Sequence, residues 1–386
     1  MSAERRLRIG FMPLVDAAAL IVAVDKGFAR AEGLDVELVR EASWSNIRDK
    51  LAIGHFDAAH LLTPMAIAST LGLGHVKVPF AAPVSLATNG NAITLSPALF
   101  EEMRQTAGCA LESPMISANA LATLVRRREA QGLEPLTFGM TFPFSTHNYQ
   151  LRYWMAEGGM DPDRDLRLVV LPPPFMAESL REGHVDGFCV GAPWSSVAVD
   201  ASLGVILHFG CEIFPRAAEK VLALRASSAE TDPQLVAALI RAIVAAAAFA
   251  DQVEARREVA SILAREDRLA VDATLIGRSL EGRLTVNASG DQRQAKDYLV
   301  LHRDGACRPS ARQAAWLYAQ MLRWGQARYT AEHLAAARGV MRADLYDSVV
   351  GETALPAAPI GAFAGPAFDG DDLAGYLQAF SIGQKI

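Results

Sequence analysis

Few side chains of this sequence stand in patterns that catalyse reactions. His55 and His60 are five positions apart, a poor spacing for one helical face, and we interpret both as core or strand-end residues. The phosphate-binding loop, the dinucleotide fingerprint, the zinc-protease helix and the nucleophile elbow are all missing from the sequence. The four cysteines lie far apart without Cys-x-x-Cys spacing, which is typical of reduced, buried thiols. We therefore expect a binding protein rather than an enzyme, with no cofactor and no metal.

Three polar side chains suggest what the ligand is. Asp16, Ser43 and Thr146 each stand where an amphipathic helix is expected to begin, and each is a plausible helix cap. Helix amino termini present unpaired N–H groups and the positive end of the helix dipole. They suit a small anion, provided that the fold brings them together.

The pattern of strands and helices that positions these residues occurs twice in the sequence. "GHFDAAHLLTP" at residues 54–64 returns as "GHVDGFCVGAP" at residues 183–193, with Gly, His, Asp and Pro at the same offsets. The interval from Gly10 to Asp57 equals the interval from Gly139 to Asp186. Each half begins with a strand-like run (residues 7–12 and 136–142) and continues with a helical pattern (16–28 and 146–159). A second strand (34–39 and 166–171), a second helix (43–52 and 175–182) and a third strand follow.

This order is typical of right-handed strand–helix–strand units on parallel sheets. The chain has 386 residues, which also favours more than one core. We predict an α/β protein of two lobes with parallel-type sheets around a ligand cleft. Lobe 1 is expected to comprise residues 1–95 and 205–386, with a helical carboxyl-terminal part, and lobe 2 residues 96–204. The helix amino termini should meet at the cleft, where the strands end.

The charge and hydrophobicity of the sequence argue against several classes of binding partner. The net charge is −6 with no block of like charges, which argues against direct binding of nucleic acid or anionic membranes. The apolar tract at residues 242–250 is too short to cross a bilayer, so no membrane insertion is expected. "MSAERRLRIGFMPL" lacks an apolar signal core, a cleavage site and a lipidated cysteine, which predicts a cytoplasmic location.

Several longer phrases resemble a known family. They are "GFMPLVDAAALIVAVDKGF", "EASWSNIRDKLAIGHFDAAHLLTPM", "MTFPFSTHNYQLRYWMAEGGMDPDRDL", "VVLPPPFMAESLREGHVDGFCVGAPW" and "AEKVLALR". The set is similar to the nitrate and bicarbonate solute-binding proteins of cyanobacterial ABC transporters (NrtA/CmpA-like) and to the cytoplasmic nitrate sensors of the NasS type. The resemblance covers residues 7–225 and implies a type II periplasmic-binding-protein fold that closes on its ligand by a hinge.

The resemblance also implies a ligand set. Trp44 matches a tryptophan whose indole N–H meets nitrate, His147 a histidine of the cleft, and Lys220 the lysine that supplies positive charge. A lysine at this position favours nitrate or nitrite over bicarbonate and implies no calcium. Two departures change the cavity: Asn91 stands where the nitrate transporters carry glutamine, and Phe144 with Ser145 replaces a glycine pair.

The family offers two roles. The NasS-type sensors imply a partner, an RNA-binding antiterminator of the ANTAR class that controls nitrate-assimilation genes. The alternative role is the substrate-binding component of a nitrate ABC transporter. Pyrimidine-synthesising enzymes share the fold, but their cysteine-rich site has no counterpart here. Residues 232–265 and 308–345 are helical in pattern, and the Pro/Gly/Ala-rich stretch after Gly351 is expected to be a tail along the surface, either around lobe 1 or against a partner.

Overall fold

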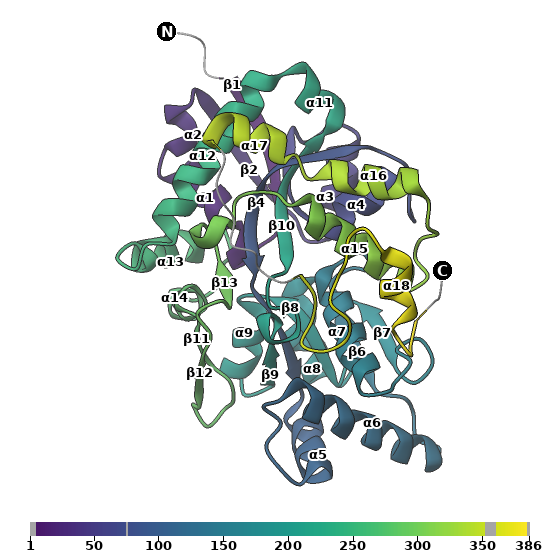
Figure 1. Ribbon diagram of the computed structural model, residues 1–386. Coiled ribbons are helices and arrows are strands. Elements are labelled where there is room, and N and C mark those ends of the chain that lie inside the picture. Colours follow the sequence, from purple (N-terminus) through teal and green to yellow (C-terminus); the bar gives the residue numbers. More distant parts are fainter. Residues whose placement is uncertain (1–4, 75, 352–359, 384–386) are drawn as a thin grey trace.

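Each half of the sequence repeat folds onto its own sheet (Figure 1). The computed structural model describes residues 5–74, 76–351 and 360–383. The first sheet contains β1 (Arg5–Phe11), β2 (Leu34–Arg40), β3 (Ala58–Leu62), β4 (Phe80–Asn89), β10 (Ala218–Arg225) and β13 (Leu299–Val300), in the order β13-β4-β10-β3-β1-β2. The second contains β5 (Asn91–Leu95), β6 (Thr137–Met140), β7 (Arg167–Val170), β8 (Gly187–Gly191) and β9 (Val205–Phe209), in the order β7-β6-β8-β5-β9.

The two sheets share one topology. In the first, β2, β1 and β3 run parallel and β10 joins β3 antiparallel. In the second, β7, β6 and β8 run parallel and β5 joins β8 antiparallel. Strands such as β3 and β8 are buried along their whole length because helices cover both faces of each sheet. The predicted two-lobed α/β architecture is confirmed.

Helices in lobe 1 surround the first sheet. They are the 3-10 turn η1 (Val15–Ala17), α1 (Ala18–Asp25), α2 (Phe28–Ala31), α3 (Trp44–Ala52), α4 (Thr63–Leu71), α11 (Ala226–Thr231), α12 (Pro233–Ala250), α13 (Arg256–Ala264), α15 (Ala311–Arg323), α16 (Ala331–Val340) and α17 (Ala343–Val350). The single helix expected from Asp16 to Phe28 is interrupted, because Gly27 adopts a φ of 80° between α1 and α2.

Lobe 2 carries α5 (Pro97–Ala107), α6 (Pro114–Ala130), α7 (Thr146–Glu157), the 3-10 turn η2 (Pro173–Phe175), α8 (Met176–Arg181) and α9 (Trp194–Asp200). The remaining elements are α10 (Gly210–Ile213), which packs on α7, β5 and β9, α14 (Ala273–Glu281), the hairpin β11 (Arg283–Thr285) and β12 (Gln292–Gln294), the 3-10 turn η3 (Arg303–Gly305) and α18 (Leu373–Gln378). Figure 1 shows α14 and the hairpin on one side of the molecule and α18 on the other.

The repeated Gly-His-x-Asp phrase does the same structural work in both lobes. Asp57 Oδ2 accepts a hydrogen bond from the backbone N–H of Arg8 at 2.8 Å, and the backbone N–H of Asp57 donates to the carbonyl of Arg8. Asp186 makes the same two bonds with Thr137, the side-chain bond again at 2.8 Å. Each aspartate thus ties the segment after a helix to the first strand of its sequence repeat, β1 or β6, which explains why the phrase occurs twice.

Strand pairing moves both predicted lobe boundaries. The prediction ended the first part of lobe 1 at residue 95 and resumed it at residue 205, but β5 and β9 pair with each other and belong to the second sheet. The chain therefore crosses between lobes after β4 and again before β10. The first crossing is a tight turn in which Asn89 and Gly90 have φ values of 63° and 107°.

Asn89 joins the two crossings. Its Nδ2 donates to the carbonyls of Pro215 at 3.1 Å and Asp297 at 2.8 Å, while its Oδ1 accepts from the backbone N–H of Ala217 at 2.8 Å. This side chain is buried, so its bonds hold the strands that connect the lobes in one register. We call the residues around Asn89 and Ala217 the hinge.

Among the residues that the structure describes, one helix is apolar and long enough to cross a membrane by length and composition alone. This is α12, whose 18 residues have a mean hydropathy of 1.8 and are 56% buried inside the fold. It contains the tract at residues 242–250 and packs against α1, α2 and β4. Its apolar surface is therefore used in the core of lobe 1.

The described part of the tail, residues 360–383, contacts both lobes. The backbone N–H of Phe363 donates to the carbonyl of Ile213, and Tyr153 Oη of α7 donates to the carbonyl of Ala364 at 2.7 Å. On the other side, Trp316 Nε1 of α15 donates to Tyr376 Oη of α18 at 3.0 Å. The tail thus links α7 of lobe 2 to α15 of lobe 1, more than the single-lobe wrapping considered from the sequence. Residues 352–359 of the predicted tail lie outside the described residues.

Candidate anion-binding site

A strand irregularity brings two adjacent charged side chains together between the lobes. Successive side chains of a strand normally point to opposite faces. Opposite β4, however, β10 shifts register on both sides of Lys220, and Glu219 and Lys220 converge. Lys220 Nζ lies 2.8 Å from Glu219 Oε1 and 2.8 Å from Asp16 Oδ2. All three side chains are essentially inaccessible to solvent, at 0–1% exposure.

Asp16 is a charge partner and not a helix cap, as the sequence had suggested. It lies in η1 and caps no helix. Its Oδ1 lies 3.0 Å from His60 Nε2, and His60 Nδ1 accepts from the backbone N–H of Met12 at 3.4 Å, which places the histidine proton on Nε2. Burial alone would raise the pKa of Asp16, but Lys220 and the His60 hydrogen bond outweigh it and lower that pKa to about 2. Asp16 is therefore ionised.

Trp44 places an unpartnered donor in the same cluster. Ser43 caps α3 as predicted, accepting from the backbone N–H of Asn46 at 3.3 Å, and Trp44 follows as the first helical residue. Its ring meets His60 edge to face at 5.4 Å and lies 5.6 Å from Lys220 Nζ. Its Nε1 is buried without a hydrogen-bond acceptor. A buried donor of this kind is costly unless a ligand supplies the acceptor.

Lobe 2 contributes the residues around Glu219. Thr146 Oγ1 donates to Glu219 Oε2, and Asn91 Nδ2 donates to the same oxygen at 2.9 Å. His147 Nδ1 lies 3.0 Å from Thr141 Oγ1 and 3.6 Å from Glu219 Oε1, and His147 Nε2 has no partner. The expected cap role of Thr146 is wrong, because Ser145 caps α7 by accepting from the backbone N–H of Asn148 at 3.1 Å.

All predicted site residues therefore meet in one buried cluster: Asp16, Trp44, Asn91, Thr146, His147 and Lys220. Together with Glu219 and His60 we call it the anion cluster. Sequence reasoning missed these last two. Glu219 was missed because neighbouring residues of a regular strand, such as Glu219 and Lys220, are expected to face opposite sides of the sheet. His60 was missed because its spacing from His55 does not indicate a binding site.

The net charge of the anion cluster is not positive, so it does not by itself attract an anion. Burial lowers the pKa of both His147 and His60, so both rings are neutral. For Lys220, the two carboxylates outweigh burial and raise the pKa, which keeps the ammonium charged. Burial raises the pKa of Glu219. The cluster is therefore neutral when Glu219 holds a proton and carries one negative charge when it does not.

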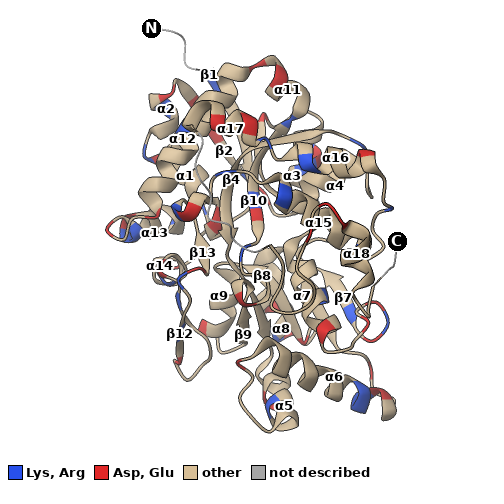
Figure 2. Cartoon of the chain, viewed as in Figure 1, with Lys and Arg blue, Asp and Glu red and all other residues tan. Residues whose placement is uncertain are grey.

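Two aromatic residues of lobe 2 close the cleft. Phe142 lies beneath the guanidinium of Arg48 in α3, with 5.7 Å between the guanidinium carbon and the ring centre. Phe144 packs 6.4 Å from Phe142, and its ring faces Gly74 of lobe 1, 3.3 Å from where a Cβ on that glycine would stand. The departure at Phe144 and Ser145 thus supplies a closing contact and a helix cap. Around both lobes, acidic and basic residues are interspersed in the view of Figure 2, so the site depends on its own charges.

Comparison with known proteins shows the family of the chain. A model of the NMT1-like family matches residues 2–264, more than half of the chain. The chain belongs to the NMT1-like family. The crystal structure of the periplasmic nitrate-binding protein NrtA from Synechocystis superimposes with a TM-score of 0.88 at 27% identity, covering 99% of both chains. The type II periplasmic-binding-protein fold is thereby confirmed.

Two curated relatives of this NMT1-like protein are also named for nitrate binding or import. The nitrate/nitrite binding protein NrtA of Nostoc is 32% identical over 328 residues, covering 83% of this chain and 71% of that protein. The nitrate import ATP-binding protein NrtC of Synechocystis is 32% identical over 391 residues, covering 98% of this chain. The chain spans only about half of that second protein, 56% of its length. Bicarbonate transport and binding proteins are among the relatives as well.

Proposed function

We propose that this protein binds nitrate or nitrite in the anion cluster and closes its two lobes over the ion. The observation that carries the proposal is one cluster inaccessible to bulk solvent that contains the Lys220 ammonium and two unpartnered ring nitrogens, Trp44 Nε1 and His147 Nε2. These groups come from both lobes, so an ion bound among them stabilises the closed form over the open one.

The chemistry of nitrate suits such a set. The ion is flat, singly charged and weakly basic, so burying it without partners costs several kcal/mol. A charge-assisted bond from Lys220 is the largest expected contribution, about 1.5–3 kcal/mol, and the Trp44 indole adds a neutral one. When Thr141 donates its hydroxyl proton to His147 Nδ1, the neutral imidazole carries its own proton on Nε2 and becomes a third donor.

Calorimetric titration of the purified protein with nitrate, nitrite and bicarbonate tests the proposal. We expect nitrate or nitrite to bind more tightly than bicarbonate. Lys220→Ala should weaken binding by about tenfold to a few hundredfold, whereas the exposed control Lys26→Ala, whose lysine pairs with Glu258, should bind as the wild type does. Equal nitrate affinity in Lys220→Ala and the wild type would reject the site.

We further propose that the protein is a cytoplasmic sensor. In this scheme, the closed, anion-bound form releases an ANTAR-type antiterminator that the open form holds. The likeness to NasS-type sensors supports this role, and ligand-driven closure supplies the two states that a partner could distinguish. A pull-down with tagged protein should capture the antiterminator without nitrate and lose it at saturating nitrate. A complex that persists at saturating nitrate and nitrite would contradict the sensor role.

The alternative is a substrate-binding component of a nitrate ABC transporter. The relatives named for nitrate import and for nitrate binding support this role equally. The two roles differ in compartment and partner, so cell fractionation and capture of a membrane permease separate them. Recovery in the periplasm, or on the membrane with a permease, would favour transport over sensing.

A further inference from the structure

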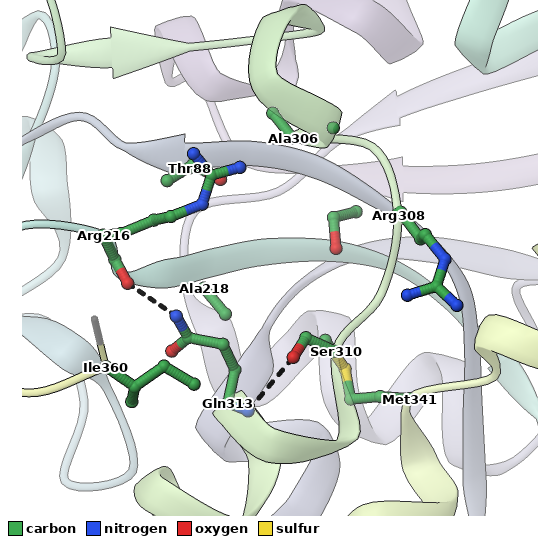
Figure 3. A pocket seen from close by; sticks show the side chains of 11 residues that line it. Thr88, Arg216, Ala218, Ala306, Arg308, Ser310, Gln313, Met341 and Ile360 are labelled. Atoms are coloured by element: carbon green, nitrogen blue, oxygen red, sulfur yellow. Dashed lines mark hydrogen bonds between the residues drawn. The ribbon is translucent and has the colours of Figure 1, made fainter. Parts of the chain in front are cut away.

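A cavity lies beside the hinge (Figure 3), and none of its lining residues belongs to the anion cluster. Its volume is about 80 Å³. That is several times the roughly 10–15 Å³ that one water molecule needs and far below the roughly 300–1,000 Å³ of drug-sized sites. The cavity is therefore suited to a ligand of a few atoms. Its polar lining consists of Ser85, Thr88, Arg216, Arg308, Ser310 and Gln313.

The two guanidinium groups of the lining differ in their partners. Arg308 forms a bidentate ion pair with Asp347, with Nε–Oδ1 and Nη2–Oδ2 distances of 2.7 and 2.5 Å, so its charge is balanced. Arg216 donates to the backbone carbonyl of Asp304, which carries no charge. Among the residues that the structure describes, it forms no ion pair with a carboxylate. The half-buried Arg216 thus leaves an uncompensated positive charge at the cavity.

The amino terminus of α15 adds to this positive potential. Ser310 caps the helix, accepting from the backbone N–H of Gln313 at 3.3 Å, and both residues line the cavity. The first-turn N–H groups and the positive end of the dipole of this 13-residue helix therefore lie at the cavity wall.

Gln313 requires a hydrogen-bond donor from the ligand, whereas Arg216 and the amino terminus of α15 favour negatively charged acceptors. Its Nε2 donates to the carbonyl of Arg216 at 2.7 Å, which fixes the orientation of the amide because a carbonyl can only accept (Figure 3). The Oε1 is left buried without a hydrogen-bond partner, and the residue is 6% exposed. A buried carbonyl of this kind requires a donor, which a fully deprotonated oxyanion cannot supply.

We propose that this cavity binds a small oxyanion that retains a hydroxyl proton, namely hydrogen phosphate or bicarbonate. The charged oxygens face Arg216 and the amino terminus of α15, and the hydroxyl group donates to Gln313 Oε1. Nitrate and sulfate carry no proton at neutral pH and leave Gln313 unpaired. The site is separate from the anion cluster and does not depend on the proposed nitrate function.

The test is calorimetric titration of the full chain, saturated with nitrate, using phosphate, bicarbonate and sulfate. The proposal predicts binding of phosphate or bicarbonate, with sulfate at least tenfold weaker. Arg216→Gln should weaken binding about tenfold to a hundredfold. Arg312→Gln, in the first turn of α15 but outside the cavity, should change it less than twofold. Gln313→Met should erase the preference over sulfate.

Circular dichroism spectra and melting temperatures of these variants report whether each still folds, independently of nitrate binding. The same phosphate and bicarbonate titrations on Trp44→Phe, without nitrate, should give the wild-type affinity, since Trp44 belongs to the anion cluster and does not line the cavity. Sulfate binding as tightly as phosphate, or an unchanged affinity in Arg216→Gln, overturns the proposal. So does the absence of binding at millimolar concentration, which means that only water fills the cavity.

Discussion

Glu219 should make nitrate binding dependent on pH. The nitrate ion is proposed to lie against Lys220 Nζ, which is 2.8 Å from Glu219 Oε1. An anion there stands about 4–5 Å from the carboxylate, and at an effective dielectric constant of about 20 the repulsion is about 3–4 kcal/mol. That energy raises the pKa of Glu219 in the complex and corresponds to an affinity difference of a few hundredfold between its protonated and ionised forms, since about 1.4 kcal/mol is tenfold. Nitrate and a proton should therefore bind together.

The direction of the pH dependence follows from two effects that both raise the pKa of Glu219. Burial already raises the pKa of Glu219 above its ordinary value of 4.5, and a bound anion raises it further. Between the pKa of the free protein and that of the complex, the complex holds the extra proton. Nitrate affinity should therefore fall as pH rises through this window, by up to tenfold per unit and a few hundredfold in total. The window lies above 4.5.

Calorimetry from pH 5 to pH 9, in buffers with different ionisation enthalpies, measures both the affinity and the protons taken up. In Glu219→Gln the slope should vanish, with affinity near the low-pH value of the wild type. The control Glu101→Gln, on the surface helix α5, should keep the wild-type slope. His147 is the competing proton acceptor, since its Nδ1 lies 3.6 Å from Glu219 Oε1. A slope that persists in Glu219→Gln, or no slope in the wild type, refutes the reasoning.

Three further changes test other parts of the structure. Lys220→Met should lower the free energy of unfolding by about 3–5 kcal/mol, because it leaves buried carboxylates unpaired; a denaturation midpoint like that of the wild type contradicts this. Trp44→Phe should cost about 1 kcal/mol of nitrate affinity, roughly fivefold, without lowering the melting temperature, since Nε1 has no bond to lose. Asp57→Ala and Asp186→Ala should each destabilise by about 1–3 kcal/mol; clearly unequal losses in denaturant titrations would argue against equivalent roles.

The architecture was predictable because its signals are local. The strand–helix rhythm and the repeated phrase around Asp57 and Asp186 each require only neighbouring residues, and they predicted two similar sheets. The lobe boundaries failed because the partners of β5 and β9 are decided by long-range pairing. No pattern within either strand indicates which sheet it joins.

The site divides in a similar way. Trp44, His147 and Lys220 came from family likeness, and the structure brings them together. Glu219 could not be found by alternation along a strand, because the register shifts of β10 override that rule. Asp16 and Thr146 were found as polar residues at helix starts, but their partners, Lys220 and Glu219, are set by how the lobes meet.

The sealing of the anion cluster has a kinetic consequence. Because its groups are at most 1% exposed, neither an ion nor water can exchange while Phe142 and Phe144 rest against the opposite lobe. Unloading can be no faster than the separation of the lobes, a motion of microseconds to milliseconds in hinged proteins. A partner that binds only the closed form would therefore prevent release of the ion. A partner that binds only the open form would promote release, however tightly the closed form holds the ion.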